Sequence, residues 1–455
     1  MTEENKHFDI TPMMVPFFDV HLIIPLFDFL RENQIYDPKS ITIEKIRAVE
    51  KTNLVESVED EYESYKQDSD LQKEYQQIKP TLNKRKSEIY EQINHEPSDI
   101  QSLQTFFQDT ELLANLKSNN NFNIDYLNHH YYITYEKLEN YYIYAKFKYE
   151  CGIYDEAEVM LGNYILIVQS ISSHQLIHYQ AALWGRLACR ILQAKWNDAI
   201  ADLTLVKESI EVRNVQPLDQ LRQRGWLMHW SLFVYLFQHN GIESLIDLYS
   251  ERYYQQTIEN LCPWLLRYYI IAIILAPNKR SKLLKDILNM IKSLKYLYND
   301  SMTEFLYSLF DSFDFNIATI KLIECSTLIK NDFFLKVHYD KFMHEARMLI
   351  CEMYCTVHRT IDLTMLAEKL QFSNEEAEKW MVDMVRGNNG TGTSLNAKID
   401  SFGKQVIIAP PVSTSHQQVI DATKELTTRT SVLSNNLENL IKEQAFFLLH
   451  RAKEA

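Results

Sequence analysis

The stretch YAKFKYECGIYDEA, Tyr144–Ala157, decides the fold of this chain. It places Gly152, an aromatic ring at Tyr154 and a small side chain at Ala157 at the spacing of two antiparallel helices joined by a tight turn. Small residues let paired helices approach closely, and the aromatic ring fills the gap to the next pair. The stretch therefore predicts one helical hairpin of a repeat protein.

Two weaker copies of this pattern follow the first. In RLACRILQAKWNDA, the residues Ala194, Trp196 and Ala199 take the places of the glycine, the aromatic residue and the alanine. The segment FDFNIA repeats the aromatic residue at Phe315 and the alanine at Ala318. Because the copies are unequally spaced, we predict a mostly α protein built on an irregular tetratricopeptide-like helical-repeat solenoid.

The composition also favours helices. Only 9 of the 455 residues are glycine and 11 are proline, the two residue types that end helices and make turns. A net charge of −14 disfavours a nucleic-acid binder, which presents Lys and Arg to phosphates. The basic run Lys84–Lys86 leaves a local RNA contact open, beside the simpler interpretation of a solvated helical linker.

The sequence predicts neither an enzyme nor a cofactor site. His344, Cys351, Cys355 and His358 share one helical stripe, but its ends lie about 21 Å apart along a straight helix, so the four cannot converge on a metal. The glycine-rich segment Gly387–Ser394 lacks the lysine of a phosphate-binding loop. Motifs of serine hydrolases and of zinc proteases are also missing. The sparse cysteines instead indicate buried thiols in a reducing compartment.

No segment of the sequence is expected to enter a membrane. The longest apolar run, Leu265–Ala276, contains Arg267 and lies between Pro263 and Pro277. It is too short to span a bilayer and is expected to form a buried helix. The N-terminal residues lack the basic start of a signal peptide. We therefore expect a cytoplasmic protein.

The stretch IDLTMLAEKLQFSNEEAEKWMVDMV, Ile361–Val385, has the pattern of two short helices joined by a polar turn. Two strand-like pieces follow, Leu395–Asp400 and Lys404–Ile408, and this order is that of a winged helix. The second helix carries more acidic than basic residues, which disfavours contact with DNA phosphates. A DNA-binding regulator is therefore kept only as an alternative.

Pattern and composition divide the chain into five segments. We expect an N-terminal helical segment at 1–55, a polar helical linker at 56–124, helical repeats at 125–345, a winged helix at 346–410 and a C-terminal helical tail at 411–455.

Two elements are predicted to contact other proteins. The strand Lys404–Ile408 is expected at the end of its sheet, where its backbone could pair with another chain and Val406, Ile407 and Ile408 would add apolar contact. The alternative is that these residues only close their own sheet. In the tail, apolar residues recur every seven positions, but the second seam of a coiled coil is poor. One stripe packing on partner helices is therefore expected, with a freely solvated tail as the alternative; the stripe comprises Val419, Leu426, Leu433, Leu440 and Phe447.

A helical solenoid that leads into a winged helix resembles the PCI family of scaffold subunits. Longer stretches are similar to the E branch of that family, which belongs to eukaryotic translation initiation factor 3. They include HLIIPLFDFLRENQIYD near the start, QRGWLMHWSLFVYLF at Gln223–Phe237, and NAKIDSFGKQVI. The matches run in order from about residue 9 to about residue 426. Residues 56–118 and the loop Gly387–Ser394 depart from the family pattern, and the tail beyond about Leu426 matches only in type.

This resemblance implies a non-catalytic scaffold of translation initiation. Its expected neighbours are the c, d and l subunits of initiation factor 3, reached through the edge of the winged helix and a bundle of C-terminal helices. It also implies small-ribosomal-subunit binding and messenger RNA recruitment through the complex. A PCI subunit of the proteasome lid or of the signalosome remains the alternative within the same family.

Overall fold

The computed structural model describes residues 9–64, 69–95, 97–109, 124–170, 178–212, 216–238, 240–370, 378–379, 381–382, 385, 397–400, 405–408 and 415–454. Two compact units divide between Tyr354 and Cys355. The elements before the second unit are α1 (Thr11–Met14), η2 (Val15–Phe17), α2 (Val20–Glu32), α3 (Pro38–Val49), α4 (Val55–Ser64), α5 (Ser69–Asn94), α6 (Ser98–Gln108), α8 (Ile124–Tyr131), α9 (Tyr135–Glu150), α10 (Tyr154–Ser170), α11 (Tyr179–Leu192), α12 (Trp196–Val212), α13 (Pro217–Phe237), α14 (Gly241–Ser250), α15 (Arg252–Asn260), η3 (Pro263–Leu265), α16 (Leu266–Leu275), α17 (Pro277–Leu294), α18 (Ser301–Phe310), α19 (Phe315–Lys330) and η4 (Lys336–His338).

The second unit contains a small sheet and a long helix. Helix α20 (Tyr339–Val357) leads into it. Its elements are β1 (Thr360–Asp362), α21 (Leu363–Leu370), β2 (Ala397–Asp400), β3 (Gln405–Ile408) and α23 (Ser415–Glu454). This order confirms the predicted class, in which helical repeats precede a winged helix.

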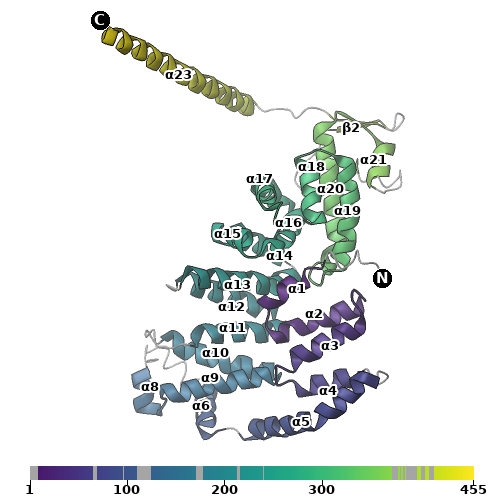
Figure 1. Cartoon of the computed structure of the whole chain (residues 1–455), viewed down its shortest axis with the longest axis vertical. Helices are drawn as coiled ribbons and strands as arrows, with labels where there is room; N and C mark the ends of the chain where they lie inside the picture. Colours follow the sequence, from purple (N-terminus) through teal and green to yellow (C-terminus); the bar gives the residue numbers. More distant parts are fainter. Residues whose placement is uncertain are drawn as a thin grey trace. The chain divides into compact units, whose positions relative to one another are not determined.

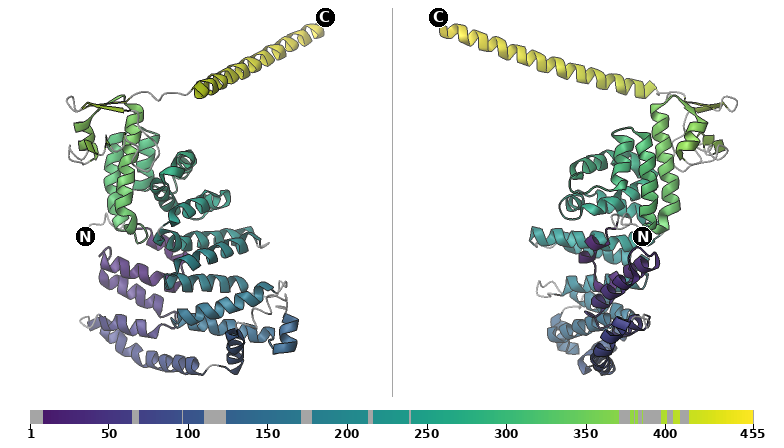
Figure 2. Two further views of the ribbon diagram at one scale, coloured as in Figure 1. Left: turned by 180° about the vertical axis from the view of Figure 1, so that it is seen from behind. Right: turned by 45° about the vertical axis from the view of Figure 1, so that its right-hand side comes forward.

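Helices of the first unit stack in sequential antiparallel pairs. Helix α10 packs on α9 and α11, α12 packs on α11 and α13, and α18 packs on α19 (Figure 1). The N-terminal helices α2 to α5 form a second column beside these pairs, and the two columns meet where α2 contacts α11 (Figure 2). The core of the unit therefore joins segments that are far apart in the sequence.

The three predicted repeats share an uncommon backbone conformation. Gly152, Ala194 and Phe313 hold the same place in their copies, and all three have positive φ, at 85°, 56° and 53°. Such a left-handed residue ends a helix and reverses the chain. In the first copy the N–H of Ile153 donates to the carbonyl of Lys148 at 3.0 Å, the long hydrogen bond of a Schellman turn. The repeat pattern therefore encodes a turn that recurs.

The other two repeat positions build the contact between helices. Ala157, Ala199 and Ala318 are fully buried, as the close approach of paired helices requires. The aromatic residue of each copy is the first residue of its helix, α10, α12 or α19. In the second and third copies the ring contacts the following helix: that of Trp196 stacks on Phe237 at 5.7 Å, and that of Phe315 lies 5.0 Å from Tyr354.

Residues 55–94 form more than the polar linker expected from their composition. Helices α4 and α5 enclose an apolar cluster with α3 that includes Val58, Tyr62, Tyr75 and Leu82. The rings of Tyr62 and Tyr75 stack at 5.0 Å. Sparse apolar residues were enough for this core because each lies on the one face that meets the neighbouring helix.

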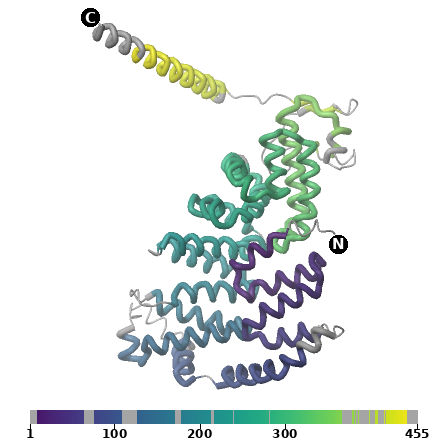
Figure 3. Tube along the Cα trace, viewed as in Figure 1, coloured from purple at the N-terminus to yellow at the C-terminus, as the bar shows by residue number. Residues whose placement is uncertain are grey.

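The N-terminal segment is fixed onto the repeats by polar contacts. The hydroxyl of Tyr149 donates to Asp19 at 2.5 Å, and Nδ1 of His21 lies 2.9 Å from the hydroxyl of Tyr154. Farther along, the indole N–H of Trp230 on α13 donates to the carbonyl of Phe17 at 3.0 Å. Figure 3 shows the purple start of the chain lying against the teal helices. The segment thus contacts both the first repeat and the later helix α13.

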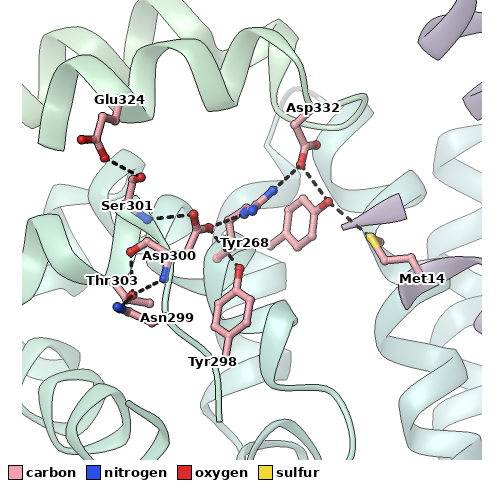
Figure 4. A network of polar contacts seen from close by, with 10 residues as sticks. Met14, Tyr268, Tyr298, Asn299, Asp300, Ser301, Thr303, Glu324 and Asp332 are labelled. Atoms are coloured by element: carbon pink, nitrogen blue, oxygen red, sulfur yellow. Dashed lines mark hydrogen bonds and ion pairs between the residues drawn. The ribbon is translucent and has the colours of Figure 1, made fainter. Parts of the chain in front are cut away.

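A buried ion network joins four separate segments. Arg267 on α16 contacts Asp300 at 2.6 Å and Asp332 at 3.5 Å, and all three side chains are at most 7% exposed (Figure 4). Asp300 caps α18 by accepting from the N–H of Ser301, and Asp332 caps the turn after α19. Tyr268 donates to Asp332 and lies 3.4 Å from the sulfur of Met14. The single arginine in the long apolar run therefore ties the later helices to the start of the chain.

Arg267→Met should destabilise the helical repeats by about 3–5 kcal/mol, because it leaves Asp300 and Asp332 buried without their counter-charge. Chemical denaturation followed by tryptophan fluorescence measures the effect. The control is Lys279→Met, which removes a half-exposed ion pair with Asp247 and should cost at most about 1 kcal/mol. Equal stability of the two variants would contradict a structural role for the network.

His229 lies at the centre of the tryptophan-rich helix α13 in one definite tautomer. Its Nδ1 lies 2.7 Å from the carbonyl of Gly225, which only accepts, so Nδ1 carries the hydrogen. Its Nε2 then accepts from the indole N–H of Trp264 at 3.0 Å. The ring stacks on Phe17 at 4.3 Å. Burial lowers the pKa of His229 to about 4, and a second ring proton would also point at the Trp264 donor.

The depressed pKa of His229 makes folding pH-dependent. In the unfolded chain the pKa of this side chain is near 6.5. The contribution of the buried neutral ring to the free energy of unfolding is therefore complete above that pH and is lost as the pH falls toward 4. Between pH 7 and pH 5 the native protein should lose about 2 kcal/mol through this group. His229→Asn, which retains a donor for Gly225, should remove that dependence, whereas the exposed control His129→Asn should keep it. Denaturant titrations at the two pH values compare the three proteins.

Candidate protein-interaction site

The winged-helix sheet has three strands in the order β1–β3–β2. Strand β3 pairs antiparallel with both neighbours: Val406 lies opposite Ile361 of β1 and Ile399 of β2. The N–H of Ile408 also donates to the carbonyl of Arg359 at 2.8 Å. The expectation that Lys404–Ile408 forms the end of the sheet is therefore wrong. The reason is that β1, although distant in the sequence, covers the other side of β3.

The two faces of this sheet differ in exposure. Val406 is 0% exposed and Ile361 is 1% exposed, so this row closes the core of the winged helix. The next row places Ile407 between Thr360 and Lys398, and Ile407 is 48% exposed. Of the three predicted interaction residues on β3, Ile407 therefore offers its side chain outward, Val406 points inward, and Ile408 is half-buried.

The helices of the winged helix are described in part. Asp362 starts α21 by accepting from the N–H and the hydroxyl of Thr364, at 2.9 and 2.7 Å. Leu363 and Ala367 of the first predicted helix are buried, and so is Met381 of the second. The loop Gly387–Ser394 lies outside the described residues, as do Leu395 and Asn396 of the first predicted strand and Lys404 of the second.

The long helix α23 presents a row of apolar side chains to solvent. Leu426 and Leu433 are each 62% exposed, and Leu440 is 56% exposed. Val419, at the start of the row, is exposed as well. Between the leucines lie mostly polar residues, so the row forms a single stripe on one face of the helix. A stripe of exposed leucines at this spacing suits the groove between helices of another protein.

The described cysteines and carboxylates form no metal site. Cys351 and Cys355 are buried, as the sequence indicated, and no three His, Cys, Asp or Glu side chains gather to hold a metal ion in the described part of the chain. A groove of about 510 Å³ lies between α2, α4, α5 and the turn before α10. Its half-buried thiol, Cys151, has its pKa raised to about 11 by burial and so stays protonated at neutral pH. None of the described helices has the length and apolarity of a membrane span.

Comparison with known proteins places the chain in a family. Residues 9–148 match the model of the eIF3 subunit 6 N terminal domain, and residues 322–409 match the PCI domain. The chain is 33% identical to the E subunit of eukaryotic translation initiation factor 3 from Arabidopsis thaliana, over 98% of its own length and 100% of that protein. The chain belongs to the E-subunit family of eukaryotic translation initiation factor 3. The family protein of Brugia malayi is 35% identical over 95% of the chain and 94% of its own length.

The family resemblance drawn from the sequence is therefore confirmed. The E-subunit protein of Caenorhabditis elegans, 33% identical, also aligns over 95% of this chain and 97% of its own length. The N-terminal family model covers the segment that docks on the repeats, and the PCI model covers the later part of α19, α20 and the described sheet.

Some important residues of this family member could not be recognised from the sequence. Trp226 and Trp230 lie in a stretch that resembles the family. Their spacing, however, does not predict that the indole N–H of Trp230 donates a hydrogen bond to the carbonyl of Phe17. Arg267 did give a signal, because a charged residue inside an apolar run must find a partner when it is buried. Its partners, Asp300 and Asp332, follow only from the packing, which brings the start of α18 and the turn after α19 to Arg267.

The sheet geometry predicts opposite outcomes for two neighbouring substitutions. Val406→Asp should unfold the winged helix, because it buries an unpaired charge between β1 and β2. Ile407→Asp should leave it folded, with a change in the free energy of unfolding of about 0.5 kcal/mol. Limited proteolysis and circular dichroism of the full chain distinguish them. Equal tolerance of both substitutions would contradict the inward orientation of Val406.

Proposed function

We propose that this chain is a non-catalytic scaffold subunit of the eukaryotic translation initiation factor 3 complex and acts in the cytoplasm. The observation that carries the proposal is the alignment with E-subunit proteins of that complex over nearly the whole chain. Because the alignment includes the N-terminal helices, the repeats and the winged helix together, it supports a role for the chain as an intact unit. In this role the chain contributes to small-ribosomal-subunit binding and to messenger RNA recruitment.

The described surfaces support assembly rather than chemistry. The repeats present large helical faces, and α23 presents a stripe of exposed leucines. Repeat proteins with such faces bind partners along their length. The expected partners are other subunits of the complex, with the c, d and l subunits as the specific candidates.

The contact through the winged helix is assigned to different residues than the sequence indicated. Since β3 is central, backbone pairing with a second winged helix would use an outer strand, and β2 (Ala397–Asp400) is the outer strand of the hairpin. Ile407 supports this contact from the exposed face beside Lys398. Edge pairing of this kind supplies main-chain hydrogen bonds, while the exposed isoleucine adds apolar area.

The leucine stripe of α23 is proposed as the second contact. Leu426, Leu433 and Leu440 would pack into a bundle formed with the C-terminal helices of neighbouring subunits. Burying one leucine contributes about 1.5–3 kcal/mol, so the three together contribute substantially to a helix–helix contact. Without such a bundle, the three leucine side chains of α23 would stay exposed to water.

Affinity purification of the tagged chain from a ribosome-containing lysate, with mass spectrometry, tests the proposal. We expect the other initiation factor 3 subunits together with small-subunit ribosomal proteins. Recovery of proteasome-lid or signalosome subunits without ribosomal proteins would replace the proposal with the alternative from the same family. A salt-sensitive, sequence-selective gel shift with duplex DNA would instead favour a winged-helix regulator.

The same purification tests the helical contact through paired variants. Leu426→Glu with Leu433→Glu should lower recovery of the partner subunits at least tenfold, because both charges fall within the stripe. The matched control is Thr428→Glu with Asn435→Glu, which adds the same charge on the opposite face of α23 and should leave recovery unchanged. If both pairs lower recovery alike, the stripe is not the contact.

A further inference from the structure

Helix α17 carries an exposed basic stripe that the scaffold role leaves unused. Lys282, Lys285, Asn289 and Lys292 recur at helical spacing and are all exposed. The first and last lie about 15 Å apart along the helix axis. Residues 277–297 contain six Lys and Arg and one acidic residue, in a chain whose net charge is −14. The stripe therefore departs sharply from the charge of the chain as a whole.

Some Lys and Arg side chains of α17 form ion pairs within the described part of the protein, and others do not. Arg280 is buried and bonds to Glu352, Lys279 pairs with Asp247, and Lys292 pairs with Asp311. Lys282 and Lys285, by contrast, form no ion pair with any side chain that the structure describes. Helix α17 packs against α16 and α18 (Figure 1). Lys282 and Lys285 are exposed to solvent.

An exposed aromatic side chain follows the stripe at the end of the helix. Tyr296 is 97% exposed and comes directly after the C-cap residue Lys295. The ammonium of Lys295 lies 4.2 Å from the centre of the Tyr307 ring. A tyrosine this exposed makes no contribution to the core, and its ring is free to stack on a planar group.

The other basic run of the sequence is arranged differently. Arg85 donates to the carbonyl of Glu50 and to Asn53, and Lys86 contacts Glu59 at 2.9 Å. Two of the three cations at Lys84–Lys86 are thus used inside the protein. The RNA contact considered for this run from the sequence therefore loses its support, whereas the α17 stripe keeps its two unpaired lysines.

We propose that the α17 stripe and Tyr296 bind single-stranded RNA, with Lys282 and Lys285 on phosphates and the tyrosine ring under a base. Lys is depleted in protein–protein interfaces, and the positions of the stripe on α17 hold neither Arg nor an apolar residue. Ammonium groups along a helix followed by an exposed aromatic ring suit a polyanion whose bases are unpaired. The assignment deepens the proposed function, because it names a direct RNA contact within a chain proposed to act in messenger RNA recruitment.

Fluorescence anisotropy of the full chain with a labelled uridine oligomer tests the assignment across a series of salt concentrations. Lys282→Gln with Lys285→Gln should weaken binding about tenfold and lower the slope of log affinity against log salt by about 1.4, since each phosphate contact contributes about 0.7. Tyr296→Ala should weaken binding at least fivefold without changing that slope. The matched control, Lys84→Gln with Lys146→Gln, removes two exposed lysines elsewhere and should leave both quantities unchanged.

Three outcomes would overturn the RNA assignment. The control pair could weaken binding as much as the α17 pair, which would indicate general electrostatic attraction. The α17 pair could leave RNA affinity unchanged while a partner subunit is lost from the purified complex, which would assign the stripe to a protein. Poly-glutamate could displace the RNA as readily as unlabelled RNA does, which would indicate a site for any polyanion.

The test separates this inference from the proposed function. The α17 variant should still recover the initiation factor 3 subunits, because the stripe lies apart from the leucines of α23 and from the sheet in the sequence. If it assembles normally but binds RNA like the native chain, the inference fails and the scaffold role stands. If the native chain recovers none of those subunits, the scaffold role fails whatever the RNA result is.

Discussion

The first unit depends on one buried charge. Arg267 lies inside an apolar helix, and an unpaired guanidinium there would cost several kcal/mol. The chain meets this constraint by bringing Asp300 and Asp332 to it from the ends of two other helices. Because each aspartate also caps its own helix or turn, the network fixes both the position and the start of those elements. Tyr268 contacts both Asp332 and Met14, so the network also connects to the beginning of the chain.

The docking of the N-terminal segment explains why the solenoid is irregular in sequence. Between the second and third repeat copies lie α13 to α18, and these are the helices that meet Phe17 and Met14. Helices that receive another segment need large aromatic and polar partners in place of the small residues of a simple repeat. The tryptophan-rich helix α13 has this character, with Trp230 and His229 both contacting Phe17.

The surfaces of this family member differ in the chemistry they offer. Helix α23 exposes leucines, the winged-helix sheet exposes Ile407, and α17 exposes lysines with a tyrosine. Apolar stripes favour partner helices, since their burial releases water, whereas unpaired lysines favour phosphates. One scaffold can therefore hold protein partners and RNA on separate elements.

By itself, the sequence determined the helical hairpins, because a left-handed turn residue, an aromatic start and a buried alanine are local requirements that recur at Gly152, Ala194 and Phe313. It also determined the family, through rare residues in a fixed order, and the buried apolar helix α16. Only the tertiary structure decided that β3 is central, since the neighbours of a strand depend on pairing with distant segments such as β1. It likewise decided which lysines remain unpaired, because an ion pair depends on where a distant carboxylate comes to lie.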